Sequence, residues 1–384
     1  MKISVKNFLL IMVMLMTCGC ISNNKSSTSS TDLSSNNFVS NHSTSCSSSS
    51  IIESSSSENE KNIMKTNYIN PIFTKEEFAD PAGIYCEKDN YYYLFATGGK
   101  IMRSKDMVNW TKRTNAFPSI PAWGTNGAGL WAPDVQYING QYVMYYSLST
   151  WGDSNPGIGV ATASKPTGPW VDLGELFRSQ NIGVNNSIDS MTFVDTDGKV
   201  YIVWGSMRGN YIVELTEDGL ELKGGITEAR KNKIRIAGLD TSLPWDEETY
   251  EGSYIIYENG YYYLFLSKGH CCKGLNSTYK VVVGRSKRVT GPYVDHEGRD
   301  MKNRGVGKVI LDKNENFVGP GHNSLLKDQE GNYYIYYHTY TKEYTEYRVL
   351  AMDRLQFDEE GWPYINDGTP SSSEMEGPTT FLNK

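Results

Sequence analysis

Five side chains that carry a charge or can bind a metal each open one copy of a repeated phrase. The phrase is a short extended segment, a turn such as Asn259-Gly260, and a run of the aromatic and β-branched residues that favour strands. The five residues that open it are Asp80, Asp134, Asp189, Glu251 and His322. Carboxyl groups gathered in one pit repel one another, which raises the pKa of at least one and leaves another ionised. An acid that can protonate a leaving oxygen and a carboxylate that can activate water are what hydrolysis of a glycosidic bond requires.

The repeated phrase extends to four strands. After each hairpin comes a third extended segment, such as 100–103, and then a turn that often leads to an aromatic residue, such as Trp110. Four strands per unit, repeated radially, are typical of a propeller blade. We therefore predict an all-β fold, a five-bladed β-propeller; an open two-sheet sandwich would not predict five copies of one phrase. The stretches 224–249 and 295–319 exceed the repeat and are predicted to be loops.

The propeller would bring the five opening residues together. In such a fold the first strand of each blade lines the central axis, and all first strands run in the same sense. Residues that begin those strands therefore converge on one mouth of the axis. A single Asp at the start of a strand is usually only a turn cap. The set carries more weight, because the position is acidic in four of the five units while the flanking residues vary.

The N-terminus has the pattern of an export signal. Lys2 and Lys6 precede the apolar run 8–16, which is too short to span a bilayer. A cysteine after a small residue closes this part of the chain. We therefore predict a lipoprotein-type signal peptide over residues 1–20, with Cys20 carrying the lipid; an ordinary cleaved signal is the alternative.

A Ser- and Asn-rich stretch separates the signal from the rest of the chain. Residues 21–65 hold too few apolar side chains to offset the entropy of ordering, so they are predicted to be a disordered tether. Residues 66–384 would then form the propeller catalytic domain. The lipid would hold this domain at a bacterial cell envelope, on the cell surface or in the periplasm; without the lipid the protein would be secreted.

Composition excludes other classes of partner. The net charge of −7 argues against nucleic acid, and no Gly-rich phosphate loop or dinucleotide fingerprint follows a predicted strand, so no organic cofactor is expected. We expect a monomer whose only contact with a membrane is the lipid. The adjacent pair Cys271-Cys272 does not form a disulfide framework with the other cysteines. A bond between neighbours would strain the intervening peptide, so two thiols packed in a loop are favoured.

These residues resemble glycoside hydrolase family 43, in particular the arabinanases that cut α-1,5-linked arabinan. The resemblance covers nearly all of the predicted propeller. The motifs that carry it are Ala79-Asp80-Pro81, Leu130-Trp131-Ala132-Pro133-Asp134, Asn186-Ser187-Ile188-Asp189, Tyr250-Glu251-Gly252-Ser253-Tyr254, Cys271-Cys272-Lys273-Gly274, Val283-Gly284-Arg285-Ser286, Thr290-Gly291-Pro292-Tyr293 and Gly319-Pro320-Gly321-His322-Asn323-Ser324.

The resemblance implies hydrolysis with inversion. It makes Asp80 the general base and Glu251 the general acid, while Asp189 orients Glu251 and keeps it protonated. Inversion needs room for a water molecule, so the carboxyl groups of the base and the acid should lie roughly 6.5–9.5 Å apart. Ser190 departs from the family, in which many members have Pro after the middle Asp.

The resemblance also suggests residues that bind ligands. His322 corresponds to a residue near a metal on the propeller axis, usually taken as calcium, although calcium prefers oxygen ligands. A histidine hydrogen-bonded inside the channel is the alternative. Trp131 is predicted to stack on a sugar, or else to pack against its neighbouring blade. Asn186 and Ser206 are predicted to contact the substrate.

The sequence leaves three functions open. The first is an endo-acting arabinanase whose partner is arabinan or an arabino-oligosaccharide. The second is an exo-acting arabinofuranosidase or β-xylosidase of the same family, since the conformation of the loops around the cleft decides between them. The third is a glycan-binding propeller lipoprotein without catalysis. Such a binder need not keep Asp80, Asp189 and Glu251, and all three are present.

Overall fold

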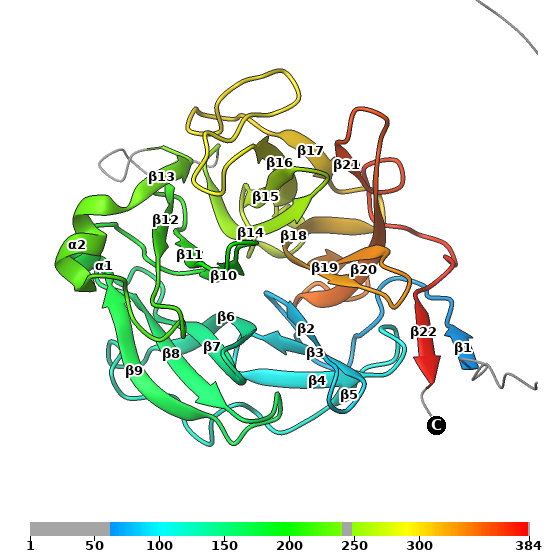
Figure 1. Ribbon diagram of the computed structural model, residues 1–384. Helices are drawn as coiled ribbons and strands as arrows, with labels where there is room; N and C mark the ends of the chain where they lie inside the picture. Colours follow the sequence, from blue (N-terminus) through cyan, green and yellow to red (C-terminus); the bar gives the residue numbers. More distant parts are fainter. Residues whose placement is uncertain (1–61, 240–247, 383–384) are drawn as a thin grey trace, which may run out of the picture. The chain divides into compact units, whose positions relative to one another are not determined.

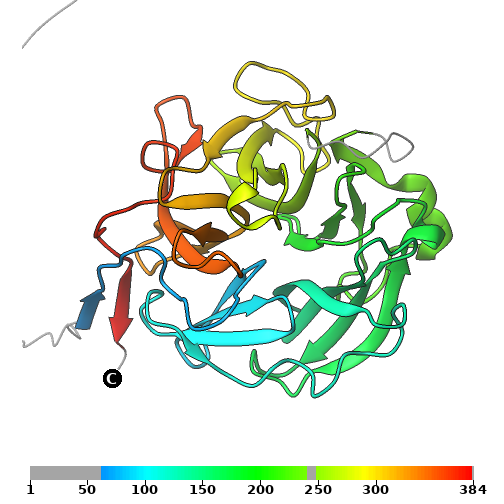
Figure 2. The ribbon, with the colours of Figure 1, turned by 180° about the vertical axis from the view of Figure 1, so that it is seen from behind.

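Five four-stranded antiparallel sheets surround a central axis. The computed structural model describes residues 62–239 and 248–382, all of which lie in the compact unit 59–384. Figure 1 shows the sheets arranged radially in chain order, and Figure 2 shows the same ring from behind. The predicted all-β, five-bladed propeller is confirmed. The predicted signal peptide and nearly all of the predicted tether lie outside the described residues.

Each blade takes its four strands consecutively from the chain, with the first strand innermost. Blade 1 comprises β2 (Ala82–Cys86), β3 (Tyr91–Ala96), β4 (Lys100–Ser104) and β5 (Thr111–Lys112). Blade 2 comprises β6 (Gly129–Ile138), β7 (Gln141–Ser149), β8 (Gly157–Ala163) and β9 (Val171–Arg178). Blade 3 comprises β10 (Met191–Val194), β11 (Val200–Trp204), β12 (Asn210–Glu214) and β13 (Ile234–Ala237). Blade 4 comprises β14 (Tyr250–Glu258), β15 (Tyr261–Lys268), β16 (Lys280–Ser286) and β17 (Lys308–Leu311). Blade 5 comprises β18 (Phe317–Lys327), β19 (Tyr333–Thr341), β20 (Val349–Phe357) and β21 (Pro363–Tyr364).

The short helices lie between strands. They are α1 (Ser179–Ile182), α2 (Gly225–Asn232) and the 3₁₀ turn η1 (Gly274–Asn276). The prediction that 224–249 and 295–319 are loops is wrong in part, because the first stretch holds α2 and β13 and the second holds β17. These outer strands have four residues each, so their alternating pattern is too short to stand out. No helix within the described residues is long and apolar enough to cross a membrane.

Turn chemistry fixes the register of the hairpins. In the β14–β15 turn Asn259 and Gly260 have φ values of 50° and 78°, as a turn with two left-handed central residues requires. Their neighbours Glu258 and Tyr261 are paired directly across the two strands. The same dipeptide type closes the β6–β7 hairpin. The first strand of each blade therefore runs along the axis, and the second strand returns antiparallel beside it.

Aromatic and aliphatic side chains fill the space between neighbouring blades. Between blades 4 and 5, Tyr263 and Phe265 of β15 pack with Ile335 and Tyr337 of β19, and all four are buried. A buried hydrophobic side chain of this size contributes about 1.5–3 kcal/mol. The wedge between blades is thus the core of the fold, and the axis is left to polar residues.

The ring is closed by the segment that precedes blade 1. The strand β1 (Asn62–Lys65) pairs with β22 (Thr379–Leu382), and Phe73 forms a bridge with Leu350 of blade 5. The range predicted as a tether therefore ends in a strand. That part of the prediction is wrong, because the partner strand lies more than 300 residues away and leaves no local signal in the sequence.

A buried side chain locks this closure. Asn70 donates through its amide nitrogen to the Met352 carbonyl (2.7 Å) and the Ser371 hydroxyl (2.9 Å), and its oxygen accepts from the Met352 amide (2.9 Å). The same nitrogen lies 3.3 Å from Asp353, a buried carboxylate that also accepts from Tyr337 at 2.6 Å. Asn70 thus satisfies backbone and side-chain groups of blade 5 from the opposite end of the domain.

We predict that Asn70→Ala destabilises the domain by about 2–4 kcal/mol, because it leaves several buried polar groups without partners. Urea-induced unfolding followed by tryptophan fluorescence would measure the loss. The control is Asn232→Ala on the exposed face of α2, whose side chain donates to the exposed Glu228 at 3.1 Å. Equal stability of the two variants would show that the closure does not depend on Asn70.

Candidate active site

One residue at the start of the first strand of every blade has a positive φ. The values are 58° for Asp80, 39° for Ala132, 57° for Asp189, 60° for Gly252 and 49° for His322. Only Gly adopts this region without cost, and other residues hold it at an expense of about 1–3 kcal/mol unless their surroundings impose it. Asp80, Asp189 and His322 occupy this position in blades 1, 3 and 5, whereas in blade 4 it falls on Gly252, directly after Glu251.

The preceding blade imposes this conformation through a hydrogen bond. The amide of Asp189 donates to the Ser147 hydroxyl (3.0 Å), and the amide of His322 donates to the Ser267 hydroxyl (2.8 Å). The amide of Ala132 likewise donates to the Thr97 hydroxyl (3.0 Å), and the amide of Asp80 donates to Nδ1 of His338 (3.2 Å). Each acceptor lies near or just beyond the end of the second strand of its blade, so these four bonds tie the first strands of blades 1, 2, 3 and 5 to the preceding blade.

Asp134 does not lie at this mouth, contrary to the prediction. The residue equivalent to Asp80 in blade 2 is Ala132, two positions earlier. The β6–β7 ladder shifts register between Trp131 and Asp134, and such an irregularity displaces the repeated phrase along the strand. Asp134 instead lies deeper on the axis, where it accepts from the amide of Thr192 (2.8 Å), and burial raises its pKa to about 7.

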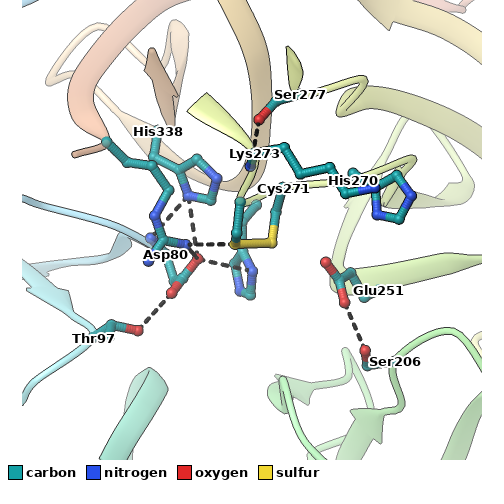
Figure 3. Close-up of a disulfide and its surroundings, with 12 residues drawn as sticks. Asp80, Thr97, Ser206, Glu251, His270, Cys271, Lys273, Ser277 and His338 are labelled. Atoms are coloured by element: carbon teal, nitrogen blue, oxygen red, sulfur yellow. Dashed lines mark hydrogen bonds and ion pairs between the residues drawn. A yellow bond between two sulfur atoms is a disulfide. The ribbon is translucent and has the colours of Figure 1, made fainter. Parts of the chain in front are cut away.

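Asp80 is surrounded by four hydrogen-bonding or charged groups (Figure 3). The Thr97 hydroxyl donates to its Oδ2 at 2.5 Å. Its Oδ1 lies 3.2 Å from Nδ1 of His338, 3.3 Å from Nδ1 of His322 and 3.4 Å from Nη1 of Arg348. These partners come from blades 1 and 5, so the carboxylate sits across the seam where the ring closes.

The charge of Arg348 keeps Asp80 ionised. Burial alone would raise the pKa of Asp80, but Arg348, His322 and His338 outweigh it and hold the pKa well below its usual range. Burial lowers the pKa of His338 to about 4, so that ring is neutral at neutral pH and its Nδ1 accepts the hydrogen bond from the Asp80 amide. Arg348, which also pairs with Glu77 at 3.0 Å, provides the permanent positive charge.

The pKa of Asp189 is shifted in the opposite direction to that of Asp80. Burial, followed by the charges of Glu251 and Asp80, raises the pKa of Asp189 well above its usual range. Ser206 donates to Oε2 of Glu251 at 2.6 Å. Asp189 therefore favours its protonated form at a pH where Asp80 is ionised.

Tyr279 shows that the three carboxyl groups converge. Its ring is fully buried, and its pKa is raised well above the usual range first by burial and then by Glu251, Asp189 and Asp80. Charges act on one hydroxyl in this way only when they lie around it. The structure thus brings together Asp80, Asp189 and Glu251, as the sequence predicts. The separation predicted between Asp80 and Glu251 stays a prediction.

The predicted sugar-binding residues fall into two groups. Trp131 lies 5.5 Å from Trp151, ring centre to ring centre, and Trp151 is 79% exposed. This pair offers an open aromatic surface. Asn186 donates to the Ser206 carbonyl (3.1 Å), and Ser206 donates to Glu251, so both side chains have partners within the protein. Substrate contacts by Trp131, Asn186 and Ser206 stay predictions.

His322, the predicted metal ligand, faces the carboxylate of Asp80. Within 62–239 and 248–382 no group of three or more His, Cys, Asp or Glu side chains could hold a metal ion. The residues present therefore do not form a calcium cage, since calcium takes six to eight oxygen ligands. Calcium at His322 stays a prediction.

Cys271 and Cys272 are joined in a disulfide, so the prediction of two thiols is wrong. Their Cα atoms are 3.8 Å apart, the ordinary spacing across a trans peptide, so the bond requires no cis peptide. Figure 3 shows the disulfide in the mouth that also holds Asp80 and Glu251. Sequence reasoning also assigned no site role to Arg348, His338 or Tyr279. His338 lies within β19, whereas Arg348 and Tyr279 lie just before β20 and β16, so the opening phrase of a blade marks none of them.

This arrangement defines a class of protein. A propeller whose axis presents an ionised carboxylate, Asp80, together with the carboxyl groups of Asp189 and Glu251 has the groups needed to activate water on one side of a bond and protonate a leaving oxygen on the other. That is the equipment of an acid–base hydrolase acting on glycosidic bonds.

Comparison with known proteins identifies the family. Residues 68–363 match Glycosyl hydrolases family 43. An extracellular exo-α-(1→5)-L-arabinofuranosidase of Cellvibrio japonicus is 36% identical over 295 residues, which cover 72% of this chain and 83% of that protein. An extracellular endo-α-(1→5)-L-arabinanase of Bacillus subtilis is 33% identical over 275 residues, which cover 69% and 79%. A solved structure of a Cellvibrio cellulosa α-L-arabinanase complexed with arabinohexaose gives a TM-score of 0.69 at 32% identity and covers 77% of this chain and 96% of that chain. The chain belongs to glycosyl hydrolase family 43, and the protein is a glycosidase.

We predict that Arg348→Met moves the acid limb of the kcat/KM profile to higher pH by about one unit or more, because an adjacent cation lowers a carboxyl pKa by about that much. The sign follows from Asp80: it must be ionised to accept a proton, and without the cation it is protonated at a higher pH. Hydrolysis rates from pH 3 to 9 would show the shift. Arg348→Lys should restore part of it, and Arg113→Met on the exposed surface should have no effect. An unmoved acid limb in Arg348→Met would mean that another group controls Asp80.

Proposed function

We propose that this protein is an inverting endo-arabinanase that hydrolyses α-1,5-L-arabinofuranosidic bonds in arabinan. The observation that carries the proposal is the pair of opposite pKa shifts at one mouth, with Asp80 well below and Asp189 well above the ordinary range. The named activities of the Cellvibrio and Bacillus relatives supply the substrate class.

Each carboxyl group has a separate part in the proposed reaction. Asp80 accepts a proton from water as the water attacks the anomeric carbon, while Arg348 stabilises the carboxylate until then. Glu251 donates a proton to the leaving oxygen, and Ser206 holds its carboxyl group in place. Asp189 shares the proton of the pair and keeps Glu251 supplied with it. Water and leaving group lie on opposite faces of the sugar, so the anomeric configuration inverts.

We predict that Glu251→Gln lowers cleavage of natural arabinan by about 10²–10⁴-fold, because glutamine cannot donate the proton. The variant should retain most of its rate on an aryl arabino-oligosaccharide whose leaving group needs no proton. Asp80→Asn is the matched control and should lose both activities, since the attacking water has no base. Equal losses of Glu251→Gln on both substrates would remove Glu251 from the acid role, and turnover by Asp80→Asn would point to another base.

Exo action is the second candidate, because the Cellvibrio japonicus relative is named as an exo-enzyme. Brief digestion of linear α-1,5-arabinan, followed by sizing of the early products, separates the two. We expect a ladder of oligomers, as internal cutting requires. A single small product at the earliest times would instead assign attack from a chain end.

We also propose that the protein is exported, since several relatives are named extracellular and the chain begins with a signal pattern. Lipid attachment at Cys20 would keep it at the cell envelope. Cys20 lies outside the described residues, and the mass of the mature N-terminal peptide would test the attachment.

A further inference from the structure

The Cys271–Cys272 disulfide lies in a loop on the catalytic mouth. The first strand of blade 4 begins at this mouth with Glu251, turns at Asn259-Gly260, and returns as β15, so the loop between β15 and β16 is on the same face as Glu251. Figure 3 shows Cys271 and the sulfur–sulfur bond beside Asp80 and Glu251. Sγ of Cys272 is 3.7 Å from Nη1 of Arg348, the guanidinium nitrogen that approaches Asp80.

The loop does not depend on the disulfide for its shape. The amide of His270 donates to the Thr278 hydroxyl (3.0 Å), and the amide of Thr278 donates back to the His270 carbonyl (3.2 Å). The amide of Lys273 donates to the Ser277 hydroxyl (3.0 Å). A disulfide between adjacent residues encloses no intervening residue, so it removes almost no conformational entropy from the unfolded chain. Its contribution is therefore local.

The sulfurs differ in chemistry from the charged groups beside them. Both cysteines are only half-buried, so part of the disulfide faces the mouth. The neighbouring groups of Asp80, Glu251 and Arg348 are charged or hydrogen-bonding. A disulfide is apolar and polarisable, donates no hydrogen bond, and is fixed in one shape by its own ring. Such a surface suits the C–H face of a sugar, whereas two thiols would rotate independently and carry weak donors.

We propose that the Cys271–Cys272 disulfide is a substrate-positioning wall, which contacts the C–H face of the arabinosyl unit and holds it between Asp80 and Glu251. This inference rests on the proposed function. A disulfide in this role also makes hydrolysis sensitive to reductants. A trialkylphosphine and one water convert the disulfide to two thiols and a phosphine oxide, and the loosened wall lets the sugar move away from the geometry that both carboxyl groups require.

The test uses the full chain in three states: oxidised, reduced with a water-soluble trialkylphosphine, and as the variant C271S/C272S. We expect kcat/KM on arabinohexaose to fall about tenfold or more in the last two states, since small misplacements at a reacting centre have effects of this size. The thermal unfolding midpoint should stay within about 2 °C, because so small a ring barely stabilises the fold. Thiol counting would confirm that reduction exposes two additional thiols.

Two controls make the outcome decisive. The phosphine must leave C271S/C272S unchanged, which excludes effects through the other cysteines, including the buried Cys86. Reoxidation of the reduced chain should restore activity. Unchanged kcat/KM in the fully reduced chain would overturn the inference.

Calorimetric titration with arabinohexaose separates failure of this inference from failure of the proposed function. If the oxidised chain binds the oligosaccharide but does not cleave arabinan, the proposed hydrolysis fails while weaker binding after reduction still supports the wall. If the oxidised chain hydrolyses arabinan and reduction changes neither binding nor rate, only the inference fails. Absence of binding by the oxidised chain would overturn both.

Discussion

The geometry of the catalytic mouth depends on hydrogen bonds that blades 1, 2, 4 and 5 each make to the first strand of the following blade. A residue with positive φ turns the chain at the start of a first strand, and a side chain of the preceding blade accepts its amide hydrogen, as Ser147 does for Asp189. A non-glycine residue does not hold this conformation alone. The side chain that aims at the axis is therefore fixed by a neighbour, and the propeller must close before its acids are in place.

Closure of the ring explains why the pKa of Asp80 is lowered while that of Asp189, at the same mouth, is raised. Phe78, just before Asp80, donates its amide to the carbonyl of Arg348 at 3.0 Å. This bond between the first and last blades places the guanidinium of Arg348 beside Asp80. Asp189 lies at the start of blade 3, where burial and the charge of Glu251 outweigh the same cation and raise the pKa of Asp189. One permanent charge, placed on one side of the axis, thus separates the ionised Asp80 from the protonated Asp189.

The sequence predicts the repeated parts of this arrangement and misses the single ones. Asp80, Asp189 and Glu251 could be found because each opens a copy of one phrase. Asp134 was misplaced because a register shift in β6 moves the phrase along its strand, which spacing alone does not reveal. Arg348 and His338 occur once, and their partner is about 260 residues away, so no local pattern marks them. The state of Cys271 and Cys272 depends on loop geometry, which residue types do not encode.

The same seam links stability to chemistry. Asn70 ties the segment before Asp80 to Met352, a few residues beyond Arg348, so both sides of the base are anchored to one buried network. Loosening of that network would move the cation and the carboxylate apart before the domain unfolds. A glycosidase built on a closed ring therefore places its base where closure is strongest, and the stability of the seam limits how precisely Asp80 can be held.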